Sequence, residues 1–164
     1  MSQRNYSGEN TGHTPEAIAD TNTLYSGILY EGLESDLLDL AAEGRVVVRI
    51  SEYILDELTR VLEEHGIRAE LAVKSMEYGK IQVTPEDEIR KNKRFQEYLA
   101  ESKKLIADAK DRPIYVFAKL MMEGHPNAYL VTGDSDLMKG DVTAALWGRV
   151  LTTRELIKRI IAIP

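Results

Sequence analysis

Hydrophobic and polar positions follow two alternating patterns along this chain. Short apolar, often β-branched runs are typical of buried strands, and the segments between them repeat apolar residues every three or four positions, which indicates helices with one buried face. The predicted strands are 17–20, 45–50, 80–83, 129–131 and 149–151. Strands and helices in this alternation predict an α/β fold with a central, mainly parallel sheet of four or five strands and helices on both faces.

The N-terminal segment differs in composition from the rest of the chain. Residues 1–15 are polar, rich in Gly, Ser and Asn, and without periodicity, so we expect a disordered N-terminal tail followed by a single domain over 16–164. Helical periodicity runs from 85 to about 109, and a further short helix can form from 136 to about 145.

No apolar run approaches the roughly 20 residues of a membrane span, and no signal peptide is evident. We therefore expect a cytoplasmic protein.

Charge and cysteine content narrow the chemistry. The net charge of -6 argues against a protein that coats nucleic acid by bulk electrostatics. It does not exclude a nuclease, because carboxylates that bind divalent cations contribute negative charge. The chain has no cysteine and three histidines, so a thiolate site is excluded and a metal must be held by oxygen or by one of those histidines.

Acidic residues lie where the predicted strands end or the following helices begin. Asp20 closes the first strand, and the strand 129–131 ends abruptly in the run Thr-Gly-Asp-Ser-Asp. Parallel strands bring their carboxyl ends to one edge of the sheet, where ligands bind in open α/β folds. Four acids are candidates for this edge: Asp20 after the first strand, Glu57 in the helix after the second strand, Asp111 at a helix N-terminus, and Asp134 after the Thr-Gly turn.

Each of these acids also has a structural explanation. Asp20 could cap the helix after it, and the run 133–136 could be only a turn. Glu57 could reach solvent from the edge of its helix's apolar stripe, and Asp111 could complement a helix dipole. Gathered carboxylates without balancing cations repel one another, however, so the arrangement makes sense chiefly with Mg²⁺ or Mn²⁺ among them. Such a site hydrolyses phosphodiesters.

Four segments together resemble the PIN-domain family: 20–29, 51–62, 108–114 and 131–137. The resemblance covers about residues 17–160 and is closest to the prokaryotic branch of toxin components of toxin–antitoxin systems, the VapC-type ribonucleases. It implies a three-layer α/β/α nuclease fold with a magnesium- or manganese-dependent endoribonuclease site.

The resemblance also implies roles for individual residues. The acids that match its catalytic, metal-binding positions are Asp20, Glu57, Asp111 and Asp134, and Asp136 matches a further acid that could bind metal or orient water. Three residues fall at positions that would orient these carboxylates: Asn22, Thr132 and Ser135. The implied partners are RNA, single-stranded or in a structured loop, an antitoxin protein, and further copies of the chain in a homodimer or higher oligomer.

The segment 78–109 is longer than is typical of the family, so the resemblance does not predict the substrate channel. It carries the one locally basic surface of the sequence: Arg90, Lys91, Lys93 and Arg94. These residues could contact RNA phosphates. They could equally form a solvated helix face, because acidic residues are interspersed further along the segment.

Two other functions compete with the ribonuclease hypothesis. A PIN-like module with a silent site would bind RNA or a protein without cleaving anything. A haloacid-dehalogenase-like phosphatase also places an aspartate after its first strand, but that chemistry needs a second aspartate two residues later, where this chain has Asn22.

Overall fold

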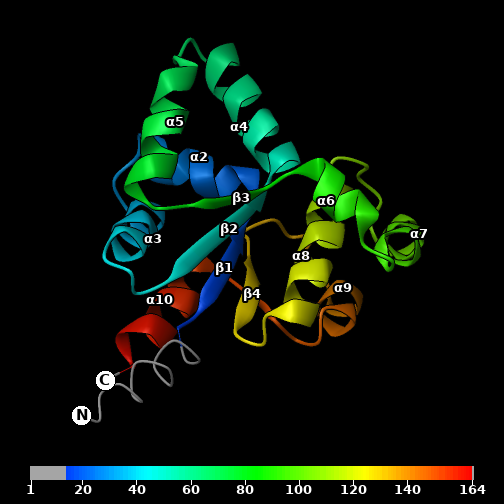
Figure 1. Cartoon of the computed structure of the whole chain (residues 1–164). Helices are drawn as coiled ribbons and strands as arrows, with labels where there is room; N and C mark the ends of the chain where they lie inside the picture. Colours follow the sequence, from blue (N-terminus) through cyan, green and yellow to red (C-terminus); the bar gives the residue numbers. More distant parts are fainter. Residues whose placement is uncertain (1–13, 164) are drawn as a thin grey trace.

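The computed structural model describes residues 14–163 and has a central sheet of five parallel strands (Figure 1). The strands are β1 (Glu16–Ala19), β2 (Val47–Ser51), β3 (Gln82–Thr84), β4 (Ala128–Val131) and β5 (Val150–Leu151), in the order β3-β2-β1-β4-β5. The predicted α/β architecture with a parallel sheet of four or five strands is confirmed. Because β1 is central and pairs with both β2 and β4, the ends of these three strands lie side by side.

Helices flank the sheet in two groups (Figure 1). The helices of the described part are α2 (Thr21–Leu29), α3 (Leu33–Ala42), α4 (Glu52–Glu64), α5 (Ala69–Tyr78), α6 (Glu86–Lys91), α7 (Phe95–Leu105), α8 (Arg112–Gly124), α9 (Gly140–Ala145) and α10 (Thr153–Ile161). One group contains α2 with α3, α4 and α5, and α10 packs on α3. In the other group α8 contacts β2 and β4 and carries α7 on its outer side. No helix within 14–163 is long and apolar enough to cross a lipid bilayer.

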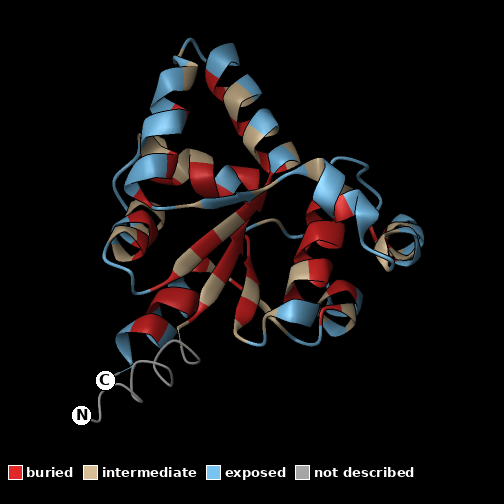
Figure 2. Ribbon diagram, in the orientation of Figure 1, coloured by how far each residue is buried: buried red, intermediate tan, exposed pale blue. Residues whose placement is uncertain are grey.

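Strands β1, β2 and β4 form the centre of the hydrophobic core, as the buried residues in Figure 2 show. Ala17, Ile18 and Ala19 of β1 are fully buried. Residues 1–13 of the expected tail lie outside the described residues. Pro15 is buried and its carbonyl oxygen accepts a hydrogen bond of 3.0 Å from the Val47 amide, so the chain contacts the sheet one residue before β1 begins.

The helical period predicted over 85–109 is interrupted in the structure. Asn92 ends α6 with an extended backbone, φ −66° and ψ 132°. Its side-chain oxygen accepts a hydrogen bond of 2.8 Å from the Arg94 amide. Asn competes in this way with helical hydrogen bonding, so α7 starts afresh at Phe95. The predicted helix from 136 likewise begins only at Gly140, because the preceding residues form a turn around Asp134.

A buried charged contact attaches α7 to α8. The Lys119 ammonium group donates a hydrogen bond to the Glu101 carboxylate, which also accepts one from the Tyr115 hydroxyl. Lys119 Nζ lies 4.7 Å from the ring centroid of Tyr98 and 5.1 Å from that of Trp147. Burial alone would raise the pKa of the Glu101 carboxyl, but these two donors hold it below its ordinary value. This contact orients the helix that begins directly after Asp111.

Candidate metal centre

Thr132 joins the ends of β1 and β4. Ala19 pairs with Val131, so the next residues, Asp20 and Thr132, emerge side by side, and the Thr132 hydroxyl donates a hydrogen bond to the Asp20 carboxylate. The other carboxylate oxygen of Asp20 accepts a hydrogen bond of 2.9 Å from the Thr23 amide. Asp20 therefore caps α2, which is the structural role predicted for it from the sequence, but it does so through only one of its two oxygens.

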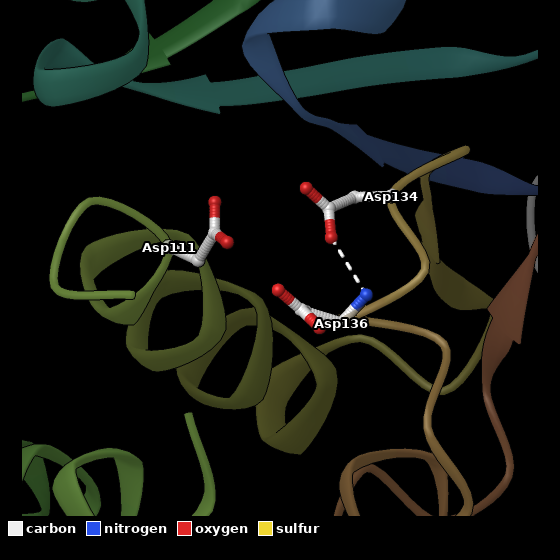
Figure 3. A group of neighbouring side chains, drawn as sticks. All are labelled: Asp111, Asp134 and Asp136. Atoms are coloured by element: carbon white, nitrogen blue, oxygen red, sulfur yellow. Dashed lines mark hydrogen bonds between the residues drawn. The ribbon is translucent and has the colours of Figure 1, made fainter. Parts of the chain in front are cut away.

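Asp134 also combines a structural role with a free oxygen. Its amide donates a hydrogen bond of 2.9 Å to the Thr132 hydroxyl, and its Oδ1 accepts one of 2.8 Å from the Asp136 amide. Residues 133–136 thus form a turn, as the structural explanation predicted, and Asp134 Oδ1 stabilises it. The second oxygen of Asp134 makes no hydrogen bond within the described residues, and Figure 3 shows it pointing away from the turn.

Asp111 faces Asp134 and Asp136 from the start of α8 (Figure 3). The three side chains each offer a carboxylate oxygen, and these oxygens all lie within 4.8 Å of one another. Asp111 occupies the N-cap position of α8, yet its side chain makes no capping hydrogen bond. Helix capping therefore does not account for the direction of this carboxylate.

The pKa of Asp111 reflects the concentration of negative charge. Burial, followed by the charges of neighbouring carboxylates, of which Asp134 contributes most, raises it to about 6. The adjacent cation does not offset this charge, because the Arg112 guanidinium donates to the carbonyl oxygens of Ile106 and Ala107. Lys139 Nζ lies 3.3 Å from Asp136 Oδ1 in an exposed ion pair, whereas Asp111 and Asp134 have no ion pair within the described residues. Oxygen donors with so few cationic partners suit Mg²⁺ or Mn²⁺. The residues present therefore fit such an ion.

Glu57 lies at the edge of this cluster rather than within it. Its carboxylate accepts a hydrogen bond from the hydroxyl of Thr21, the residue directly after Asp20. Glu57 lines a hollow of about 470 Å³ together with Tyr53 and Lys110. Burial and the charges of Glu57, Asp111 and Asp108 raise the pKa of Tyr53 above its ordinary value. The acidic groups thus act on Tyr53 of α4, while two cations, Arg60 and Lys110, also line the hollow.

The residues predicted to orient the carboxylates differ in their placement. Thr132 is buried and contacts both Asp20 and Asp134. Asn22 and Ser135 are exposed, and neither side chain hydrogen-bonds to a carboxylate in the described part of the chain. The contact of Thr21 could not be predicted, because nothing in the local sequence pattern indicates that Thr21 meets Glu57, 36 residues away.

The predicted basic surface lies apart from the aspartates, around the break between α6 and α7. Arg90, Lys91 and Lys93 are exposed and have no ion pair within the described residues. Arg94 is different, because its guanidinium donates to Glu97 at 2.8 Å and to Glu123 at 2.9 Å. Three of the four predicted RNA contacts are thus free to meet a ligand, and Arg94 is engaged within the protein.

Comparison with solved structures identifies a related architecture. The chain shares its fold with a VapBC2 chain. The solved structure is that of VapBC2 from Rickettsia felis bound to a DNA fragment from their promoter, with a TM-score of 0.54, 18% sequence identity, and coverage of 83% of this chain and 96% of that one. Neither a scan against protein-family models nor a search of curated proteins found a match. The likeness to VapBC2 therefore concerns the fold.

Protonation of Asp111 is expected to oppose cation binding. Because its pKa in the folded protein is about 6, a cation must displace a proton below that pH. We expect Mn²⁺ affinity to rise by up to about tenfold per pH unit between pH 5 and 6 and to level off above about pH 7. Isothermal titration calorimetry with Mn²⁺ at several pH values measures this, and equal affinity at pH 5 and pH 7 would contradict it.

The same shift predicts how the stability of the metal-free protein depends on pH. The folded-state pKa of Asp111 is raised from 3.8, so its contribution to stability is complete below pH 3.8 and is lost as pH rises through about 6. Asp111→Asn removes this titration. We expect the metal-free variant to show a smaller loss of stability over this interval than the wild type does in urea denaturation.

Thr132→Val is expected to weaken Mn²⁺ binding about 10- to 100-fold, the usual cost of losing a group that orients metal ligands. Valine keeps the shape but removes both the donor to Asp20 and the acceptor for the Asp134 amide. Thr132→Ser, which keeps the hydroxyl, is the matched control and should bind within a few-fold of the wild type. Calorimetric Mn²⁺ titration of the three proteins tests this, and equal weakening in both variants would show that the hydroxyl is not responsible.

Proposed function

We propose that this chain is a divalent-metal-dependent endoribonuclease of the PIN-domain type, the VapC-like toxin component of a toxin–antitoxin pair. The observation that carries the proposal is the set of oxygens from Asp111, Asp134 and Asp136 within 4.8 Å of one another. They lie at the carboxyl edge of a parallel sheet, where α/β proteins bind their ligands. The fold shared with VapBC2 supports the same assignment.

In this proposal Asp111, Asp134 and Asp136 hold Mg²⁺ or Mn²⁺. When bound, such a cation activates water and offsets the negative charge that develops on a phosphoryl group. Asp20, whose charge also raises the pKa of Asp111, would offer a further oxygen donor, because a carboxylate oxygen that accepts one hydrogen bond retains a further lone pair. Thr132 fixes the relative positions of Asp20 and Asp134. Glu57 extends the acidic edge beside the hollow that it lines.

The proposal includes partners as well as a substrate. The solved neighbour is named as a VapBC2 assembly on promoter DNA, which supports an antitoxin partner for this chain. Such a partner would cover the acidic edge and prevent substrate binding. RNA, single-stranded or in a structured loop, is the proposed substrate, and a homodimer or higher oligomer in the cytoplasm is the proposed form of the protein.

One observation favours a second function, a silent RNA- or protein-binding module. Asp20 uses both carboxylate oxygens, and Asp134 uses one, in hydrogen bonds that shape the chain itself. Aspartates at these positions would therefore be needed for folding even without catalysis. Metal binding and cleavage separate the two functions.

The test is incubation of the purified protein with a mixed pool of single-stranded and structured RNA, in Mn²⁺ and in excess EDTA, with the product ends mapped by sequencing. We expect cuts at defined positions in Mn²⁺ and none in EDTA. Mn²⁺ binding without cleavage of any RNA would favour the silent module. Failure to bind Mn²⁺ at all would overturn the metal centre and the proposed ribonuclease together.

A further inference from the structure

A second concave surface, the α6–α8 groove, lies near the carboxylates. It has a volume of about 500 Å³, and its lining includes Tyr53, Ile89, Arg90, Phe95, Gln96 and Pro113. Aromatic and apolar side chains thus form most of the walls, and a small number of polar groups sit among them. This composition is typical of sites that bind a planar, partly polar organic group.

The α6–α8 groove adjoins the candidate metal centre through Tyr53. This residue lines both the groove and the hollow that contains Glu57. The Tyr53 hydroxyl donates a hydrogen bond of 3.0 Å to the carbonyl oxygen of Lys110, the residue directly before Asp111. Pro113, which also lines the groove, follows Asp111 by two positions. A polymer held at the carboxylates could therefore place a neighbouring unit in the groove.

The groove lining contains one cation, Arg90, and one acid, Glu86. Arg90 is exposed, and its side chain makes no hydrogen bond or ion pair within residues 14–163, so its guanidinium is available to a ligand. The acid in the groove, Glu86, already accepts a hydrogen bond of 3.2 Å from the Tyr53 amide. Lys91 and Lys93 add positive charge beside Arg90. On a chain of net charge -6, this is a local surface that attracts phosphate.

We propose that the α6–α8 groove holds one nucleobase of a single-stranded RNA, adjacent to the phosphate that lies at the carboxylates. The aromatic ring of Phe95 provides a stacking surface, Arg90 contacts the backbone of that nucleotide, and Gln96 faces the base edge. This inference rests on the proposed ribonuclease function and names how that site selects its substrate. A nucleic acid fits better than a peptide, because the groove combines aromatic surface, free positive charge and proximity to the metal centre.

The test compares binding of two fluorescent single strands of equal length and charge in EDTA, an oligouridylate and its abasic ribose-phosphate counterpart, by anisotropy. Stacking of a base on an aromatic side chain is worth about tenfold in affinity, so the wild type should prefer the base-containing strand by about that factor. Phe95→Leu, which keeps apolar burial, should reduce the preference to about one. Arg90→Gln should weaken binding of both strands, and Gln96→Ala, at an exposed position, should reduce the preference without affecting folding.

Lys91→Gln is the matched control for charge, because Lys91 is on the same helix but does not line the groove. This substitution should weaken the binding of both strands equally and leave the preference for the base-containing strand intact. Equal affinity of the wild type for the two strands would overturn the proposal and leave the groove to a peptide segment of a protein partner. Loss of the preference in Lys91→Gln as well would overturn it too.

Because EDTA prevents cleavage, the binding test is independent of the ribonuclease proposal. An intact base preference with no Mn²⁺-dependent cleavage would support the groove and contradict the ribonuclease. Cleavage without any base preference would support the ribonuclease and contradict the proposed role of the groove. Where both hold, a single abasic nucleotide moved along a cleaved RNA should lower kcat/KM about tenfold at one position next to the cut.

Discussion

Asp134→Asn is expected to lower Mn²⁺-dependent RNA cleavage by at least about 100-fold, because losing a metal ligand costs more than the 10- to 100-fold loss of a residue that only orients one. Asparagine keeps a side-chain oxygen that can accept the hydrogen bond from the Asp136 amide, so the turn should persist. The substitution removes the charge of the oxygen that faces Asp111. The measurement is the initial rate of cleavage in Mn²⁺ for variant and wild type.

Asp111→Asn should cause a comparable loss of cleavage, with an additional diagnostic feature. The Asp111 carboxylate is destabilised by burial and by its acidic neighbours, so neutralising it should leave the metal-free protein at least as stable as the wild type near pH 7. A loss of activity with unchanged or increased stability cannot result from unfolding. It would therefore identify Asp111 as part of the functional site.

Asp20→Asn is expected to lose cleavage as well, both because a carboxylate of the site is lost and because the fold is destabilised. Both Asp20 oxygens accept hydrogen bonds, and an amide group can replace only one of these acceptors. Stability should therefore fall together with activity. Asp36→Asn, at an exposed aspartate in the first turn of α3, is the control for charge removal. It should leave cleavage unchanged and lower stability by no more than about 1 kcal/mol, the usual contribution of an acid at a helix N-terminus. Full activity in Asp134→Asn and Asp111→Asn would exclude the proposed metal centre.

Lys119→Met is expected to destabilise the protein by about 3 kcal/mol, the lower end of the range for removing one member of a buried ion pair. The Lys119 side chain is 9% exposed and that of Glu101 is 32% exposed, so the substitution would remove the cation from a partly buried carboxylate, to which the Tyr115 hydroxyl would still donate. Methionine has a similar length and is apolar, which separates loss of charge from creation of a cavity. The measurement is the free energy of unfolding from urea denaturation.

Two comparisons make this stability prediction specific. The double variant Lys119→Met with Glu101→Gln should recover part of the loss, because no buried charge is then left without a partner. Arg60→Ala breaks an ion pair with Glu64 in which both side chains are more than half exposed, and it should change stability by less than about 1 kcal/mol. Equal losses in Lys119→Met and Arg60→Ala would show that burial of the α7–α8 contact has no special effect.

The alternation of apolar runs and amphipathic segments was sufficient to predict the parallel sheet. Parallel strands need long crossovers, and helices in those crossovers cover the sheet. The same logic placed acids at strand ends on one edge, and the structure brings the ends of β1 and β4 together at Asp20 and Thr132. Local periodicity was less informative over 85–109, because a single Asn side chain ended α6.

The roles of individual site residues could not be predicted from local pattern in the same way. Asp111 was equally compatible with a helix cap and with a metal ligand, and only its missing capping bond and its approach to Asp134 and Asp136 distinguish the two. The α6–α8 groove arises where α4, α6, α7 and α8 meet. No sequence window contains those surfaces together.

The sequence by itself determined the fold class, the central strands and the acids at the carboxyl edge, because these follow from periodicity and from the geometry of parallel strands. Tertiary structure alone decided which carboxylate oxygens remain free, that Thr21 meets Glu57, and that Lys119 is buried against Glu101. The physical reason is that these contacts join residues many positions apart, and their formation depends on side-chain packing and burial that no local spacing encodes.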